Sequence, residues 1–196
     1  MDDRGAVNAL EQTIITTLPG EYGPPIAWRR LSATAGDLPA PGGDAPDQTV
    51  ALVSDINGDG VNDFVIGTRR GLVGPSLEWW ERTQEGWSRH LIEPDLLALE
   101  AGGAVHDIDG DGDPDLVIGE DSTGDKLYWW ENPSPDYTAR WPRREIKNAP
   151  GRQHHDQIFG DFDGNGVTEL AFWNNRVQSL FLAEVPADPT LSLIHI

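Results

Sequence analysis

The sequence predicts an all-β fold built from repeated four-stranded units, and three observations lead to that prediction. Segments with the same Asp- and Gly-rich pattern recur 52 and 54 residues apart, beginning at Asp55, Asp107 and Asp161. Short apolar runs flank each segment, which is typical of strands joined by turns. The chain contains 22 Gly, 15 Pro and 8 Trp in 196 residues, a composition that favours a turn-rich β domain over a helical one.

Each repeat is expected to form four short strands in the same order. One apolar strand enters the Asp-rich loop and a second leaves it, as at residues 64–66 and 116–118. A strand with a Trp-Trp pair follows, at residues 77–81 and 127–132, and then a strand with a Trp-x-Arg pattern. A period of about 40 to 50 residues with four strands is the signature of a propeller blade. The sequence therefore predicts a partial β-propeller of about three and a half blades.

The repeat also predicts the domain organisation. Residues 1–33 are expected to supply the last two strands of one blade, with strands over residues 13–17 and 27–31. Three blades with an Asp-rich loop, the last of them incomplete, are expected over residues 48–93, 101–147 and 154–186. Residues 191–196 resemble the translated end of a sequencing adapter and are interpreted as an artefact. We therefore expect the natural chain to be longer than this fragment.

Tryptophan and arginine recur at matched positions of the blades. Because successive side chains of a strand point to opposite faces, each Trp-Trp pair is expected to send one ring toward each neighbouring blade. These rings are expected to serve packing rather than ligand stacking. The pairs are Trp79-Trp80 and Trp129-Trp130. Arginines at equivalent positions of the last strand are expected to pair with acidic neighbours or to stack on tryptophan: Arg29, Arg89 and Arg143.

The Asp-rich loops have the pattern of a metal site. The loop at residues 107–115 carries carboxylates at its positions 1, 3, 5 and 9 and glycines at positions 4 and 6. This alternation can turn successive oxygens toward one point, and the glycines permit the sharp turn that a shell of six to eight oxygens needs. Many hard oxygen ligands favour Ca²⁺ over Mg²⁺, which tends to keep its waters. We therefore expect up to three Ca²⁺ ions, one in each loop.

The expected ligands occupy positions 1, 3, 5, 7 and 9 of each loop, position 7 through its backbone carbonyl. They are Asp55, Asn57, Asp59, Val61 and Asp63 in the first loop, Asp107, Asp109, Asp111, Asp113 and Asp115 in the second, and Asp161, Asp163, Asn165, Val167 and Glu169 in the third.

Two other interpretations of these loops are an EF-hand and a polar turn without a metal. An EF-hand needs flanking helices and a glutamate at position 12, but that position holds Ile66, Ile118 or Phe172. Polar turns without a metal also favour Asp, Asn and Gly. Charge argues against such turns, because the three loops hold eleven carboxylates, and carboxylates about 4 Å apart repel by roughly 1 to 4 kcal/mol per pair.

Loops of this kind, each followed by a short apolar strand, resemble the FG-GAP or VCBS repeats of integrin-α-like propellers over about residues 50–185. The resemblance implies that Ca²⁺ binds between the first and second strands of each blade. It also implies a module that binds a glycan or a protein partner, outside the cell or in the periplasm, where the cation is abundant. The remaining blades of the full-length chain are the other expected partner.

Composition narrows the classes of partner. Fourteen Lys and Arg against 33 Asp and Glu give a formal net charge of −19, which argues against nucleic acid. No apolar run approaches the length of a membrane span, so no membrane insertion is expected. The chain has no Cys, which excludes thiolate chemistry. Its first residues lack the pattern of a secretory signal, so export would require a longer N-terminus.

A possible ligand site is expected on the rim of the propeller channel, over residues 120–125, 153–156 and 174–176. His154, His155 and Asp156 form the most enzyme-like cluster there, since imidazole beside carboxylate suits general base chemistry. Adjacent strand side chains point apart, however, so a polar contact surface is the preferred interpretation. His106 is expected to be a strand residue beside the metal loop. A polysaccharide lyase or other carbohydrate-active enzyme that uses His154 or His155 is the first alternative function, and a purely structural adhesin segment is the second.

Overall fold

A computed structural model of the chain describes residues 29–148 and 152–189. The chain divides into two compact units, residues 1–40 and 41–196. In the first unit, residues 33–36 form a turn in which the amide of Gly36 donates to the carbonyl of Ala33 at 3.1 Å. The strand expected over residues 13–17 lies outside the described residues. Of the strand expected over residues 27–31, Arg29–Leu31 are described and are not in a strand.

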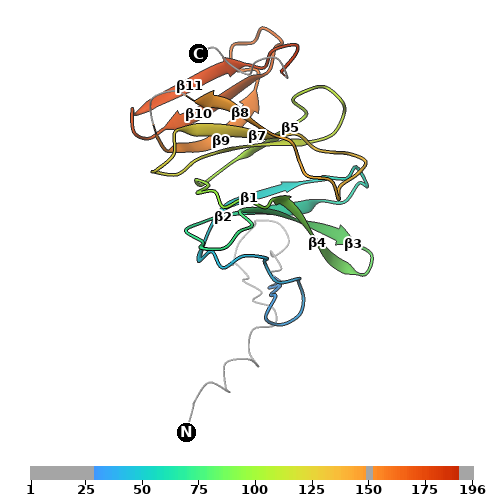
Figure 1. The fold of residues 1–196 in the computed structure, drawn as a ribbon. Coiled ribbons are helices and arrows are strands. Elements are labelled where there is room, and N and C mark those ends of the chain that lie inside the picture. Colours follow the sequence, from blue (N-terminus) through green and yellow to red (C-terminus); the bar gives the residue numbers. More distant parts are fainter. Residues whose placement is uncertain (1–28, 149–151, 190–196) are drawn as a thin grey trace, which may run out of the picture. The chain divides into compact units, whose positions relative to one another are not determined.

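The second unit contains three antiparallel sheets, and the described residues form no helix (Figure 1). The first sheet has the order β1 (Asp47–Ser54), β2 (Asp63–Arg69), β3 (Leu77–Thr83), β4 (Gly86–Glu93). The second has the order β5 (Ala104–His106), β6 (Asp115–Gly119), β7 (Lys126–Trp130), β8 (Arg143–Asn148). The third has three strands, β9 (His154–Gly160), β10 (Glu169–Asn174) and β11 (Ser179–Glu184), with β10 in the middle. This architecture confirms the all-β fold and is the one expected of a partial propeller.

The strand register makes the three sheets equivalent position by position. Trp79 on β3, Trp129 on β7 and Leu182 on β11 each lie opposite the same position of the second strand. Those second-strand residues are Val65, Val117 and Ala171. The third sheet therefore repeats the geometry of the first two, although it lacks their Trp-Trp pair.

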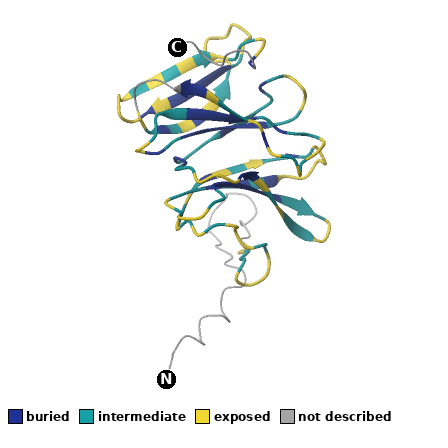
Figure 2. Ribbon diagram, viewed as in Figure 1, coloured by how far each residue is buried: buried dark blue, intermediate teal, exposed yellow. Residues whose placement is uncertain are grey.

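The core lies between the sheets, where the buried residues gather into two clusters (Figure 2). One cluster joins the first and second sheets and contains Trp79 and Trp130. The other joins the second and third sheets and contains Trp129 and Phe172. Trp129 and Trp130 are adjacent on β7, and both are 0% exposed. The prediction that a Trp-Trp pair faces both neighbours is therefore confirmed for this pair.

The repeated arginines pair with acids, as expected for Arg89 and Arg143. Arg89 contacts Glu78 within the first sheet. Arg143, on β8 of the second sheet, reaches Glu93 of the first sheet at 2.6 Å. The indole N–H of Trp130 donates to the same carboxylate at 3.1 Å. Because Glu93 is 1% exposed, these two contacts across the sheets compensate a buried charge.

The three Asp-rich loops join the first and second strands of their sheets, at β1–β2, β5–β6 and β9–β10. The loops that enter the first strands and those between the second and third strands lie at the opposite end of each sheet, because successive strands are antiparallel. The fold therefore separates the candidate metal loops from the candidate rim.

Candidate metal centres

Left-handed glycines shape all three Asp-rich loops. The glycines at positions 4 and 6 have φ values from 71° to 97°, a region that other residues seldom adopt. They are Gly58 and Gly60, Gly110 and Gly112, and Gly164 and Gly166. The sharp turn predicted from these glycines is therefore present in each loop.

In each loop, the carboxylate of the aspartate at position 1 accepts hydrogen bonds from backbone N–H groups of the same loop. Asp107 Oδ1 accepts the N–H of Gly110 at 2.8 Å, and its Oδ2 accepts that of Gly112 at 3.1 Å. Asp55 and Asp161 accept backbone N–H groups of their loops in the same way. These bonds fix the direction of the first carboxylate in each loop.

Carboxylate oxygens converge in the second and third loops. Oxygens of Asp107, Asp109 and Asp111 lie within 4.8 Å of one another. In the third loop, oxygens of Asp161, Asp163 and Glu169 do the same. The structure thus brings together three of the expected ligands in each of these loops.

The first loop has an asparagine, Asn57, at position 3. Side-chain oxygens of positions 1 and 3 accept the same backbone N–H. The N–H of Asp59 donates to Asp55 Oδ1 at 3.0 Å and to Asn57 Oδ1 at 3.1 Å. The third loop repeats this arrangement, since the N–H of Asn165 donates to both Asp161 and Asp163. The oxygens at positions 1 and 3 therefore face the same point in both loops.

The acid at position 9 is buried in all three loops and accepts the N–H of position 2. In the second loop, Asp115 accepts from Ile108 at 3.1 Å and from Asn132 at 2.8 Å. Burial raises the pKa of Asp115 to about 7, against the opposing effect of these N–H donors. Burial likewise raises the pKa of Asp63. Both oxygens of these two aspartates are thus engaged by backbone, which the sequence did not predict.

Glu169, at position 9 of the third loop, differs from those two aspartates. Its Oε2 accepts the N–H of Phe162 at 2.7 Å. Its Oε1 is buried and has no hydrogen-bond partner in the described part of the chain. This oxygen belongs to the residue that gathers with Asp161 and Asp163, so a hard cation bound there would supply the missing partner. The residues of the third loop therefore fit Ca²⁺.

Positions 5 and 7 complete the turn. The side-chain oxygens of Asp59, Asp111 and Asn165 accept the N–H of position 7, at 2.8, 3.0 and 2.6 Å respectively. Ligation by the carbonyls of Val61, Asp113 and Val167 stays a prediction.

Electrostatics also favours a cation. Burial raises the pKa of Asp109, and the neighbouring charge of Asp111 raises it further. A bound cation would oppose both effects and lower this pKa, because it stabilises the ionised carboxylates.

The sequence interpretation did not identify a glutamate that directly follows the Trp-Trp pair in the first and second sheets. Glu81 accepts the side-chain N–H of Asn57 at 3.0 Å, and Glu131 holds the same place in the second sheet. The signal was present in the repeated acid directly after each Trp-Trp pair.

The enzyme-like cluster separates in the structure. His154 is 0% exposed, and its Nε2 lies 3.1 Å from the carbonyl of Asp125. Its Nδ1 lies 3.0 Å from the amide nitrogen Nδ2 of Asn174, which can only donate, so Nδ1 is the acceptor and Nε2 carries the proton. Burial lowers the pKa of His154. Both ring nitrogens are thus engaged.

His155 points elsewhere, with Nε2 3.6 Å from the buried carboxylate of Glu100. The lyase alternative therefore depends on His155. His106 stacks on Phe159 with ring centroids 4.6 Å apart, and burial lowers its pKa, as suits a strand residue beside the loop.

The three segments expected at the rim do lie side by side. The N–H of Gln153 donates to the carbonyl of Gly124 at 3.2 Å, and the N–H of Asn175 donates to the carbonyl of Gln153 at 3.0 Å. These bonds hold segments 120–125, 153–156 and 174–176 next to one another, and their exposed residues include Ser122, Asp156 and Asn175.

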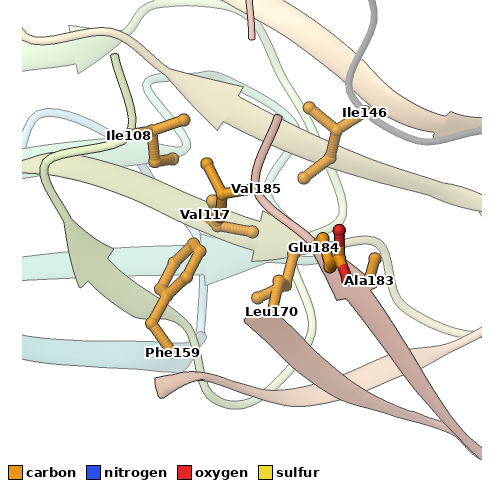
Figure 3. A pocket seen from close by; sticks show the side chains of 8 residues that line it. All are labelled: Ile108, Val117, Ile146, Phe159, Leu170, Ala183, Glu184 and Val185. Carbon is orange, nitrogen blue, oxygen red and sulfur yellow. The ribbon is translucent and has the colours of Figure 1, made fainter. Parts of the chain in front are cut away.

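A small hollow lies between the second and third sheets (Figure 3). Apolar side chains line most of it, among them Val117 and Phe159, and Glu184 lies at its border. Its volume of about 10 Å³ holds about one water molecule. This hollow is therefore a packing defect rather than a small-molecule site. The described ranges, 29–148 and 152–189, contain no helix that could span a membrane.

Comparison with known protein families finds a match for part of the chain. Residues 107–172 match the model described as the FG-GAP-like repeat. The matched segment begins at position 1 of the second loop and ends within β10, so it contains both loops in which the carboxylates gather. No curated protein matches the chain.

Proposed function

Because the chain carries an FG-GAP-like repeat at residues 107–172, we propose that it is a calcium-stabilised binding module. Each Asp-rich loop holds one Ca²⁺, and the sheets form part of a larger propeller that binds a glycan or a protein partner. The module works outside the cell or in the periplasm, where Ca²⁺ is abundant enough for weak sites.

One observation carries the calcium part of this proposal. Glu169 Oε1 is buried without a hydrogen-bond partner among the described residues. One carboxylate oxygen of the same residue lies within 4.8 Å of oxygens of Asp161 and Asp163. A buried carboxylate oxygen is costly unless a cation or a donor compensates it. The matching cluster of Asp107, Asp109 and Asp111 supports the same conclusion for the second loop.

The residues at positions 1, 3, 5 and 9 of each loop would hold the ion, with the carbonyl of position 7. When bound, Ca²⁺ supplies positive charge that neutralises the clustered carboxylates. Side chains of the loop also fix its backbone through hydrogen bonds. Position 9 ties the loop to backbone amides, as Asp115 does with Ile108 and Asn132. The role of the metal is therefore structural.

Exposed leucines on β11 support further blades as partners. Leu77 on β3 and Leu127 on β7 are both 0% exposed, and they occupy the position equivalent to Leu180 on β11. Leu180 is 64% exposed, and Leu182 is 44% exposed. In the first and second sheets, the next sheet along the chain covers Leu77 and Leu127. A further sheet of the same kind would therefore fit the face of the third sheet that carries Leu180 and Leu182.

The three adjacent segments 120–125, 153–156 and 174–176 are the proposed contact surface for the glycan or protein partner. It lies at the end of the sheets opposite the Asp-rich loops, so that cation binding and partner binding use different residues.

Calorimetric titration of the whole chain tests the calcium proposal. Titration of the chelator-treated chain with CaCl₂ is expected to saturate at up to three ions, and titration with MgCl₂ to give weaker binding at the same pH and ionic strength. The double substitution Asp107→Asn with Asp109→Asn should remove one ion and serves as the site control. Absence of saturable Ca²⁺ binding by the folded chain would contradict the proposal.

A further inference from the structure

We propose that Glu81, directly after the Trp-Trp pair of β3, is a positioning residue for the first metal loop. Its carboxylate holds the side-chain amide of Asn57 so that Oδ1 faces the loop interior and Nδ2 faces away. This inference rests on the proposed binding of a cation in that loop.

The contacts of the Asn57 amide support this orientation. Asn57 Nδ2 donates to Glu81 Oε1 at 3.0 Å. On the other side, Asn57 Oδ1 accepts the N–H of Asp59 at 3.1 Å, the same N–H that donates to Asp55 Oδ1. An ionised carboxylate only accepts hydrogen bonds, and a backbone N–H only donates. A flipped amide would lose both bonds and turn its NH₂ group toward the cation.

Glu81 is itself held in place from its other side. Its Oε2 lies 2.7 Å from Nε2 of His90, which lies on β4. The ring of His90 stacks on that of Trp79 with centroids 4.3 Å apart. The side chains of Glu81 and His90 are 24% and 25% exposed, so solvent competes only in part for these bonds. The orientation of Asn57 is therefore linked to the packed centre of the first sheet.

The second sheet has a glutamate, Glu131, at the position equivalent to Glu81, but the ligand at position 3 of its loop needs no orienting partner. Glu131 follows the Trp-Trp pair of β7 and accepts the Nε–H of Arg144 at 3.1 Å. Arg144 packs over the ring of Trp129, its guanidinium carbon 5.1 Å from the ring centroid. Position 3 of the second loop is Asp109, whose two oxygens are chemically equivalent, so no flip needs to be prevented. Glu131 therefore serves as a matched internal control.

The third sheet places Glu184 at the equivalent position, directly opposite Glu169 in the register. Position 3 of this loop is Asp163, again a carboxylate. The requirement for an orienting acceptor is thus specific to the first loop, where the ligand at position 3 is an amide.

Calorimetric titration with CaCl₂ distinguishes orientation from charge. Glu81→Leu removes the acceptor and the charge, whereas Glu81→Gln removes the charge but keeps an oxygen that can accept from Asn57. We expect Glu81→Leu to weaken one site about tenfold, as is typical of residues that orient metal ligands. Glu81→Gln should stay close to the wild-type affinity. Equal weakening by both variants, or by neither, would overturn the inference.

A rescue experiment and the second loop provide independent checks. Asn57→Asp should restore the lost affinity in the Glu81→Leu chain, because aspartate offers an oxygen in either orientation. Glu131→Leu should weaken the second site more strongly when combined with Asp109→Asn than when it stands alone. The double-mutant cycle of Glu131→Leu and Asp109→Asn can be measured even if Glu81→Leu prevents folding. Additive losses of affinity in this cycle would count against the inference. Failure of the wild-type chain to bind any Ca²⁺ would instead refute the proposed function.

Discussion

Asn132 donates its side-chain amide to the carbonyl oxygen of Ile56, 3.1 Å away in the loop of the neighbouring sheet. The backbone N–H of Asn132 also donates to the position-9 carboxylate of its own sheet, Asp115. One residue thus connects the base of the second loop to the backbone of the first. A change in either loop is therefore expected to reach the packing between the two sheets.

Glu169→Gln is expected to change stability in opposite directions with and without calcium. In EDTA, neutralising the buried, unpartnered Oε1 should raise the free energy of unfolding by on the order of 1 kcal/mol. In CaCl₂ it should lower that free energy relative to the wild type, because a charged ligand is lost. Urea denaturation in both buffers measures the two differences. Glu184→Gln, an exposed acid on the next strand, is the control. The same sign in both buffers would contradict the assignment.

Trp129→Ala should be far more costly than Leu182→Ala, although the two residues are equivalent in the register. Trp129 is 0% exposed between two sheets, so its loss should cost about 3 to 5 kcal/mol. Leu182 is 44% exposed, so its truncation should cost well under that, of the order of a surface change. Urea denaturation monitored by far-UV circular dichroism gives both values. Similar costs would mean that the outer face of the third sheet is covered in this chain.

Gly110→Ala tests the backbone of the second loop. Gly110 has φ of 77°, and an added Cβ would meet no atom within 4 Å, so any loss of stability comes from backbone conformation alone. We expect a loss of about 1 to 2 kcal/mol for alanine. Asparagine, which tolerates this region better, should cost less. Thermal unfolding of the two variants ranks them, and equal stability of Gly110→Ala and wild type would contradict the turn geometry.

His154 should make the chain less stable in mild acid. Burial lowers its pKa, so the unfolded chain binds this proton more readily than the folded chain does. Neutral, buried His154 makes its full contribution to the free energy of unfolding above about pH 6.5, the pKa of histidine in the unfolded chain. This contribution is lost as the pH falls toward the lower pKa that His154 has in the folded chain. His154→Gln should lower stability at pH 7.5 yet reduce its decline toward pH 5, with His106 leaving a residual slope. Urea denaturation across this range measures the slope, and an unchanged slope would refute this role.

The repeated elements of the fold could be predicted because local sequence determines them. Glycines at fixed places in the Asp-rich loops, apolar runs around them and a Trp-Trp pair in a strand all have short-range physical meaning. The opposite orientation of Trp129 and Trp130 follows from strand geometry alone. The third sheet was harder to align beyond its loop, because Leu182 and Ala183 stand where the other sheets carry their Trp-Trp pair.

Contacts between distant segments could not be predicted in this way. The bond from Asn57 to Glu81 spans 24 residues, and that from Asn132 to Ile56 spans 76. Both depend on the register and on the packing of sheets, which periodicity alone does not specify. The same reason explains His154, whose partners Asp125 and Asn174 come from two other segments of the chain.

Thermal unfolding of the whole chain in EDTA, in millimolar CaCl₂ and in millimolar MgCl₂ tests the central claim most directly. A cation that binds the folded loops and not the unfolded chain raises the midpoint by mass action. The account predicts a clear rise in CaCl₂ and a smaller one in MgCl₂ at matched ionic strength. A midpoint that is the same in all three buffers would contradict it, and the clustered carboxylates would then be acidic turns without a metal.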